Sequence, residues 1–164
     1  MIGTLTADDL EVVKDLRRDL HAHHATLPTP PGYRVRPFEP AWAAWCEGVA
    51  EALRARHGVV FVHRTEDQQV PDGMAYLHLL DPAALTRPIL EPTGPHAELS
   101  TLVVADTARG GGIGGALADA GEAWARGHGA VALHVAVRAS NVDARRLYLR
   151  RGAEPTFDGL VQPL

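Results

Sequence analysis

The stretch from Leu99 to Gly115, LSTLVVADTARGGGIGG, most constrains what this 164-residue chain can fold into. It begins with apolar and β-branched residues, passes through a short polar turn, and ends in five glycines interrupted only by Ile113. After it, apolar residues recur at three- and four-residue spacing, which is the pattern of an amphipathic helix. The sequence therefore predicts a strand, a glycine-rich loop and a helix in direct succession.

A loop of this kind suits phosphate oxygens, because glycines have no Cβ atoms to block a ligand and the helix end offers free N–H groups. A P-loop is excluded, since Gly115 is followed by Ala116 rather than by Lys and Ser or Thr. A dinucleotide fingerprint can be placed on Gly110, Gly112 and Gly115. Arg138 follows the next predicted strand and would suit the 2′-phosphate of NADP, so an NADP-binding oxidoreductase remains a less favoured alternative.

Composition narrows the class of protein further. The net charge of −4 makes nucleic acid an unexpected main partner, and 46% apolar residues are ordinary for one soluble domain. No apolar run approaches the roughly 20 residues of a membrane helix, and the N-terminus lacks the apolar core of a secretory signal. Cys46 is the only cysteine, so no intrachain disulfide can form. We therefore expect a cytoplasmic protein with no membrane partner.

Hydrophobic spacing predicts a helix first, from Thr6 to about His24, with Thr6 and Asp9 as its capping pair. His21, His23 and His24 lie near its end without a cysteine or acidic partner at ligand spacing, so we expect no metal site. The elements expected afterwards are a strand at 33–38, a helix from 40 to 58, strands at 59–63, 74–80 and 98–104, a helix at 112–127, a strand at 130–137 and a helix from 140 or 141 to 152. One strand or a cramped hairpin is expected after it, within 153–164.

Two motifs together resemble the GNAT superfamily of N-acetyltransferases. The first is Arg109-x-x-Gly112-x-Gly114, five residues after the end of the predicted strand, and the second is SNVDARRLYLRRGA from Ser140 to Ala153. The resemblance covers Tyr33 to the C-terminus. It implies a single domain, 1–164, of the α/β class with a central mixed sheet of about six strands flanked by helices. Residues 1–31 would then be an extra N-terminal helix and linker.

The resemblance also implies acetyl-CoA as the cosubstrate and a primary amine, on a small molecule or a peptide, as the acceptor. The glycine loop would bind the pyrophosphate, and Arg109 would add positive charge. Main-chain groups of the preceding strand would hold the pantetheine arm and polarise the thioester carbonyl. The residues assigned to cofactor binding are Leu102, Val103, Val104, Arg109, Gly110, Gly111, Gly112, Ile113, Gly114, Gly115 and Asn141.

Two residues are the catalytic candidates. The attacking amine must lose a proton, and Glu98, at the start of the central strand, is the first candidate for the base, with His96 in reserve. Alternation along a strand predicts that positions 98, 100, 102 and 104 share one face. Tyr148 resembles the family's general acid, which protonates the leaving thiolate of CoA, and helical spacing places it on one face with Asn141 and Ala144. The acetyl group would then pass directly to the amine in a ternary complex.

A non-catalytic module that binds acyl-CoA is the main alternative function, although the survival of both Glu98 and Tyr148 favours an enzyme. The acceptor amine stays open at this point, and a homodimer is possible by analogy with other proteins of this fold.

Overall fold

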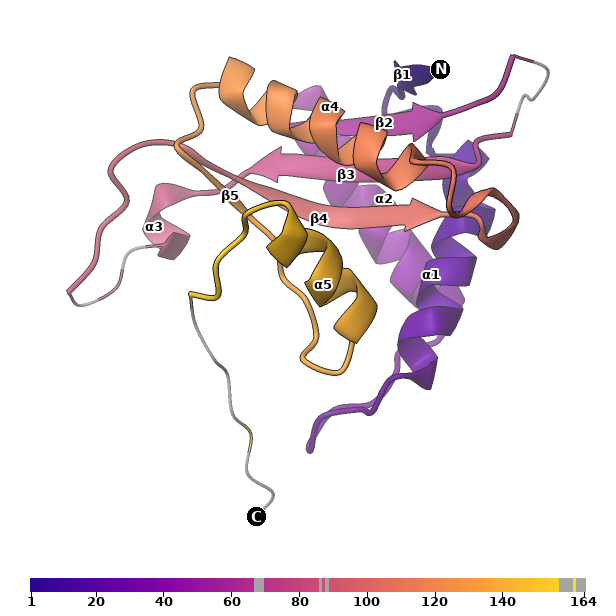
Figure 1. Cartoon of the computed structure of the whole chain (residues 1–164), viewed down its shortest axis with the longest axis horizontal. Helices are drawn as coiled ribbons and strands as arrows, with labels where there is room; N and C mark the ends of the chain where they lie inside the picture. Colours follow the sequence, from indigo (N-terminus) through magenta and orange to yellow (C-terminus); the bar gives the residue numbers. More distant parts are fainter. Residues whose placement is uncertain (67–69, 86, 88, 157–160, 162–164) are drawn as a thin grey trace.

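The computed structural model describes residues 1–66, 70–85, 87, 89–156 and 161. A five-stranded mixed sheet crosses the centre of this described part, and the strands lie in sequence order (Figure 1). They are β1 (Ile2–Thr4), β2 (Gly58–His63), β3 (Gly73–Leu79), β4 (His96–Val104) and β5 (Ala132–His134). Neighbouring strands are antiparallel from β1 to β4, whereas β4 and β5 run parallel.

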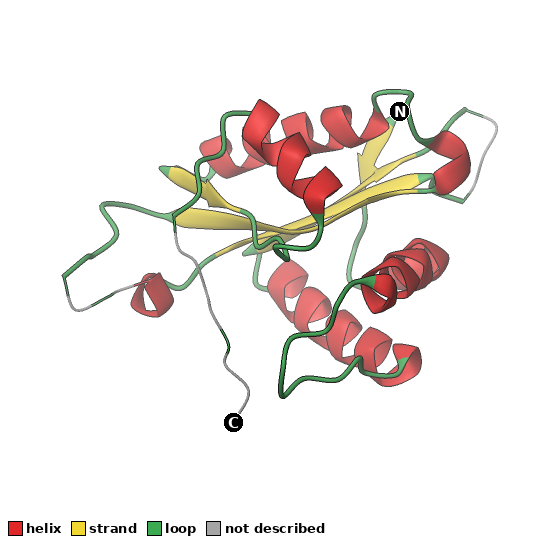
Figure 2. Cartoon of the chain, turned by 60° about the horizontal axis from the view of Figure 1, so that its bottom comes forward, coloured by secondary structure: helices red, strands yellow, loops and turns green. Residues whose placement is uncertain are grey.

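Helices cover both faces of the sheet, as the edge-on view shows (Figure 2). One face carries α1 and α2, and the other carries α4 and α5. The helical segments are η1 (Leu10–Val13, a 3-10 turn), α1 (Lys14–Thr26), α2 (Phe38–Arg54), α3 (Pro82–Leu85), η2 (Asp106–Ala108, a 3-10 turn), α4 (Ile113–Gly127) and α5 (Val142–Arg150).

Alternation along the strands divides the apolar residues between two cores. Met74 and Tyr76 of β3 point to the α1–α2 side, where they join the cluster that includes Trp42. Ala75 and Leu77 of the same strand point to the α4 side, where Leu117 is fully buried. A period of two along β3 therefore supplies both layers of the molecule.

Two glycines bring α4 close to the sheet. A Cβ atom added at Gly121 of α4 would lie 2.8 Å from Leu77 Cδ2, and one added at Gly73 of β3 would lie 2.9 Å from Ile113 Cγ2. At both positions the neighbouring side chain would have to shift to admit a Cβ atom. The first turn of α4, and with it the glycine loop, thereby lies close against the start of β3.

The predicted strand at 33–38 is wrong. Residues 33–37 are irregular and exposed, and α2 begins at Phe38 directly after Pro37, which has no N–H to donate to a sheet. The first strand is instead β1, which precedes α1 and pairs with β2. The first helix also begins later than predicted, because the Thr6–Asp9 hydrogen bonds form a turn ahead of η1.

The described sheet has five strands rather than about six, and β5 is shorter than the predicted strand at 130–137. The strand or hairpin expected after the last helix falls largely on 157–160 and 162–164, which lie outside the described residues; 153–156 are irregular. The other predicted helices and strands are present with small shifts at their ends. The single-domain organisation of 1–164 stays a prediction.

Candidate active site

The glycine loop forms an open turn at the start of α4. Gly110 and Gly112 have φ angles of 84° and 80°, in the left-handed region that favours glycine, and Gly112 is the N-cap of α4. No atom lies within 4 Å of a Cβ built at either position, so the concave side of the turn is open. The amides of Gly110, Gly111 and Gly112 donate no hydrogen bond to any described residue. These main-chain donors are therefore available to an anion.

Arg109 folds back onto the strand that precedes the loop. Its Nε donates to the main-chain oxygen of Val104 at 3.3 Å, and its Nη2 lies 2.7 Å from Asp106 Oδ1. The side chain is exposed, and the Asp106 contact neutralises part of its charge. Arg109 thus braces the turn while leaving its guanidinium at the surface beside the glycines.

The two parallel strands separate after a short region of pairing. β5 pairs with β4 only from His96 to Glu98, so the rest of β4 has no described strand beside it on that edge. The N–H of Ala105 donates to Asp72, in register with β3. Because main-chain groups alternate between the two edges of a strand, the N–H groups of Leu102 and Val104 face the open edge and that of Val103 faces β3. A gap lined by free main-chain groups results.

A β-bulge in β4 changes the predicted arrangement of faces. Tyr76 is paired with Thr101 but Leu77 with Leu99, so Ser100 is left without a partner. Glu98 consequently shares the α1–α2 face with Thr101 and Tyr76, whereas Leu102 packs on the α4 side. The prediction that 98, 100, 102 and 104 share one face is therefore wrong, because the extra residue reverses the alternation.

Glu98 lies among histidines. Its register partners are His78 on β3 and His134 on β5, and its Oε2 is 3.9 Å from His78 Nε2. Next to it, His96 Nδ1 lies 2.7 Å from His134 Nε2, with the two rings stacked. Burial, and then the neighbouring His96, lower the pKa of His134, so this ring is neutral near pH 7. Such a row of groups can accept and pass on a proton.

Sequence reasoning missed His78 and His134. A usable signal exists for His134, since it is the one ionisable residue within the apolar run VALHVAV. His78 offers no comparable signal, and its Nδ1 is buried without a hydrogen-bond partner among the described residues. Only the register with Glu98 reveals its proximity.

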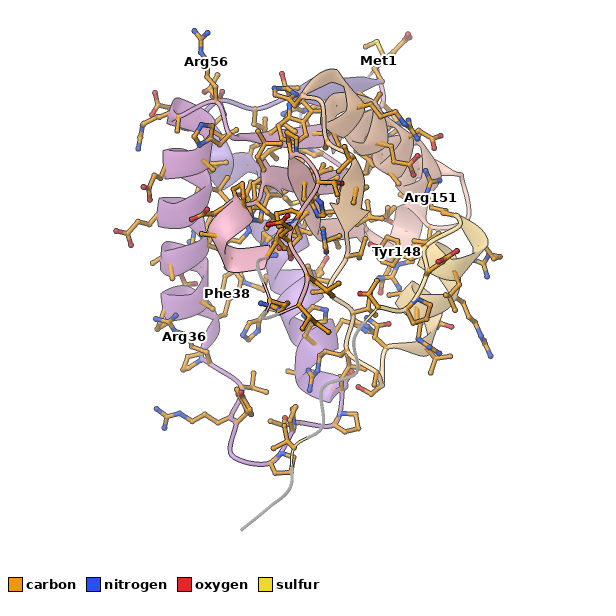
Figure 3. All side chains as sticks on the ribbon, turned by 90° about the vertical axis from the view of Figure 1, so that its left-hand side faces the viewer. Met1, Arg36, Phe38, Arg56, Tyr148 and Arg151 are labelled. Atoms are coloured by element: carbon orange, nitrogen blue, oxygen red, sulfur yellow. The ribbon has the colours of Figure 1, made fainter. Side chains whose placement is uncertain are left out.

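Tyr148 lies on the opposite side of the sheet from Glu98. It packs against the α4-side cluster and lines a cavity of about 280 Å³ together with Leu99 and Val135. Burial raises the pKa of the Tyr148 phenol to about 12. In the side view, Tyr148 and Arg151 lie on the flank opposite Arg36 and Phe38 (Figure 3). Glu98 and Tyr148 thus approach the β4–β5 gap from different faces.

Asn141 serves first as the cap of α5. Its Oδ1 accepts a hydrogen bond from the Ala144 N–H at 3.3 Å, and this orients the start of the helix that carries Tyr148.

Cys46 is half-buried in α2, and burial raises the pKa of its thiol, so the thiolate needed for nucleophilic chemistry is disfavoured.

A mixed sheet with two splayed parallel strands, followed by a glycine turn at a helix N-terminus, defines an α/β fold of the acyltransferase type. Residues 18–153 match the model of the Acetyltransferase (GNAT) family. The chain therefore belongs to this family, as the two sequence motifs predicted. No curated protein matches the chain.

Solved structures of the same fold cover the whole chain. The tetramutant of the BH1408 protein from Bacillus halodurans is 22% identical with a TM-score of 0.76 and is covered over 99% of its length. A GCN5-related N-acetyltransferase from Ralstonia eutropha JMP134 is 21% identical with a TM-score of 0.72, covered over 97%. The aminoglycoside N-acetyltransferase AAC(6')-Iy, in complex with CoA, is 17% identical with a TM-score of 0.68, covered over 98%.

In the part of the chain that the structure describes, every helix is too short or too polar to cross a membrane.

Proposed function

We propose that this protein transfers an acetyl group from acetyl-CoA to a primary amine by direct attack in a ternary complex. The observation that carries the proposal is the open edge of β4 beside the open glycine turn. The open edge of β4 offers main-chain N–H groups to a pantetheine arm, and the glycine turn offers them to a diphosphate. The AAC(6')-Iy enzyme with the same fold was solved in complex with CoA.

The residues present fit CoA in shape and charge. The empty space around Gly110 and Gly112 leaves room for phosphate oxygens to approach the main chain, and the helix N-terminus attracts their charge. Exposed Arg109 adds a cation at the rim. Main-chain N–H groups point alternately to the two edges of a strand, so only every second one faces the gap. Of the three strand residues assigned to CoA, we therefore propose main-chain contacts for Leu102 and Val104 and not for Val103.

The chemistry requires two proton movements. The amine nitrogen attacks the thioester carbonyl carbon, and its proton passes to Glu98, directly or through the neighbouring histidines. An N–H near Val104 stabilises the oxyanion that forms. The carbon–sulfur bond then breaks, and the thiolate takes the proton of Tyr148, whose high pKa keeps the phenol protonated at neutral pH. Burial disfavours the phenolate that this transfer leaves, so Tyr148 takes a proton back from solvent, to which Glu98 releases the proton of the amine, and the cycle closes.

Release of free CoA thiol from acetyl-CoA, measured with a panel of primary amines, tests the proposal. We expect amine-dependent release with the acetylated amine detected by mass spectrometry. Tight CoA binding without any amine-dependent release would instead favour the non-catalytic acyl-CoA-binding module. Stabilisation by NADP but not by CoA would favour the oxidoreductase.

A further inference from the structure

A cavity of about 370 Å³ opens on the α1–α2 face, between α1, the connector that follows it and the segment after β5. Its described lining includes four arginines and two histidines but no aspartate or glutamate: Arg17, Arg34, Arg36, Arg138, His21 and His24. This concentration of positive groups occurs in a chain with a net charge of −4. The lining of this cavity is therefore basic, although the chain as a whole carries a net negative charge.

Arg17, a half-buried residue of this lining, has no counterion among the described residues. Its Nη1 donates to the Thr101 hydroxyl at 3.1 Å, and its guanidinium carbon lies 4.6 Å from the ring centre of Trp45. Its Nε is buried and has no hydrogen-bond partner among the described residues. Burial lowers the pKa of Arg17 to about 10, and no carboxylate opposes this effect. A buried guanidinium without an acidic partner is costly unless an anion arrives from outside.

In the described part of the chain, no aspartate or glutamate pairs with the other charged groups of the cavity either. Arg138 donates to main-chain oxygens of His24, Leu27 and Pro28, which fixes the connector without neutralising the charge. Burial and the cations around it, among them Arg138 and Arg17, lower the pKa of His24. The four arginines are therefore the charged groups that the described lining offers to a ligand.

The cavity is linked to the face of β4 that bears Glu98 through Arg17, which lines the cavity and donates to Thr101. Thr101, the hydroxyl partner of Arg17, occupies the position next to Glu98 on the same face of β4, because the bulge at Ser100 separates them. Three residues of strand span at most about 10 Å. An acceptor with its amine at Glu98 can therefore extend an attached group toward Arg17.

We propose, on the basis of the function proposed above, that the acceptor amine carries an oxyanion, a carboxylate or a phosphate, which Arg17 binds inside this cavity. Arginine pairs with either group through parallel N–H donors, and Arg34 and Arg36 at the rim attract the anion. A neutral amine of the same size leaves the guanidinium unpaired and is a poorer substrate.

Matched acceptor pairs test this assignment: alanine against alaninamide for the carboxylate, and glucosamine 6-phosphate against glucosamine for the phosphate. We expect kcat/KM to be at least tenfold higher for the anionic member of one pair, and that pair identifies the anion. Arg17→Gln should abolish the difference through an approximately 10- to 100-fold rise in KM for the anionic acceptor. Arg17→Lys should retain part of the preference for the anionic acceptor.

Arg18→Gln is the matched control, since Arg18 is the next residue of α1 and pairs with Asp15 and Glu39 outside the cavity. Because Arg17 is partly buried, the rim double variant Arg34→Gln/Arg36→Gln supplies a second test that does not touch the core. Equal use of both members of each pair, or an equal effect of Arg18→Gln, would overturn the inference.

Titration calorimetry with the four compounds in the presence of CoA separates this inference from the proposed function. Absence of thiol release with every amine, together with anion binding that Arg17→Gln removes, would refute the transferase and retain the anion site. Thiol release without any preference for anions would retain the transferase and refute the anion site. Absence of both would refute both.

Discussion

Glu98 and Val104, six residues apart on β4, lie on opposite faces of the strand because the bulge at Ser100 inserts one unpaired residue between them. An even spacing along a regular strand would place both on one face. The bulge instead places the proposed base on the α1–α2 face, on which the arginine-lined cavity also opens, and leaves the proposed oxyanion donor at the open edge. The acceptor and the cosubstrate can thus approach β4 from different sides.

Replacing Glu98 by Gln should lower kcat by at least about 100-fold, because the amide cannot accept the amine's proton. The KM for acetyl-CoA should stay within about twofold, since Glu98 lies on the other face from the proposed CoA contacts. Steady-state thiol release measures both values. Exposed Glu91→Gln is the control, and a full loss in His96→Gln with none in Glu98→Gln would transfer the role of base to His96.

Tyr148→Phe should lower kcat by about 100-fold while the dissociation constant for CoA changes little, because only the donated proton is lost. The pKa of about 12 also predicts that deprotonation of this phenol leaves no alkaline limb in the rate below about pH 10. A pH series of kcat for the wild type checks this second point. Unchanged turnover of the Phe variant would remove Tyr148 from the mechanism.

Gly112→Ala should weaken CoA binding at least tenfold, since an alanine at φ 80° strains the turn that presents the free amides. Gly129→Ala is a matched control at the far end of α4, with φ 74° and equally open surroundings. Both variants should lose about 1–2 kcal/mol of stability, but only Gly112→Ala should lose CoA affinity in calorimetry. Equal CoA affinities would contradict the loop assignment.

Gly121→Ala should destabilise the fold by about 1–3 kcal/mol, because its Cβ would lie 2.8 and 2.9 Å from the two Cδ atoms of Leu77. Gly127→Ala, in the same helix with nothing within 4 Å, should instead stabilise the protein by about 0.5–1 kcal/mol. Urea unfolding of the two variants beside the wild type measures the difference. A neutral Gly121→Ala would show that α4 can move away from β3.

Stability should fall as the pH is lowered from about 7.5 through 6.5. Burial and then His96 lower the pKa of His134 below 6.5, and burial, His23 and Arg138 lower that of His24, so the unfolded chain binds protons that the folded chain does not. His134→Gln should make the decline of Tm with falling pH less steep. The comparison at pH 7.5, where both histidines are neutral, serves as the reference, and parallel curves for variant and wild type would contradict the role of His134.

Local sequence patterns predicted most of the fold because its elements are bounded by strong signals. The apolar run into the glycines fixed β4 and α4, and Asn141 marked the start of α5. The strand at 33–38 was wrong because its alternating residues resemble a strand but pair with no described strand, and Pro37 is the N-cap of a helix instead. The three residues of β1 are too few to show a period.

The candidate site was predictable only in part. The glycine turn and Tyr148 belong to contiguous motifs, whereas the bulge at Ser100 depends on pairing with β3, which is 20 or more residues away in sequence. The contacts of Glu98 with its histidines and of Arg17 with Thr101 likewise join residues that are far apart in sequence and meet only in the folded chain. No local pattern specifies them.

Among the described residues, β5 pairs with the rest of the sheet at only three positions, from His96 to Glu98 of β4. The strand that bears Glu98 and the helix that bears Tyr148 lie in two halves of the molecule, which meet at this seam and at the ion pairs of Arg151 with Asp119 and Glu122 of α4. The alignment of the two proposed proton-transfer groups depends on that seam, so substitutions at its short register should disturb turnover well before they unfold either half.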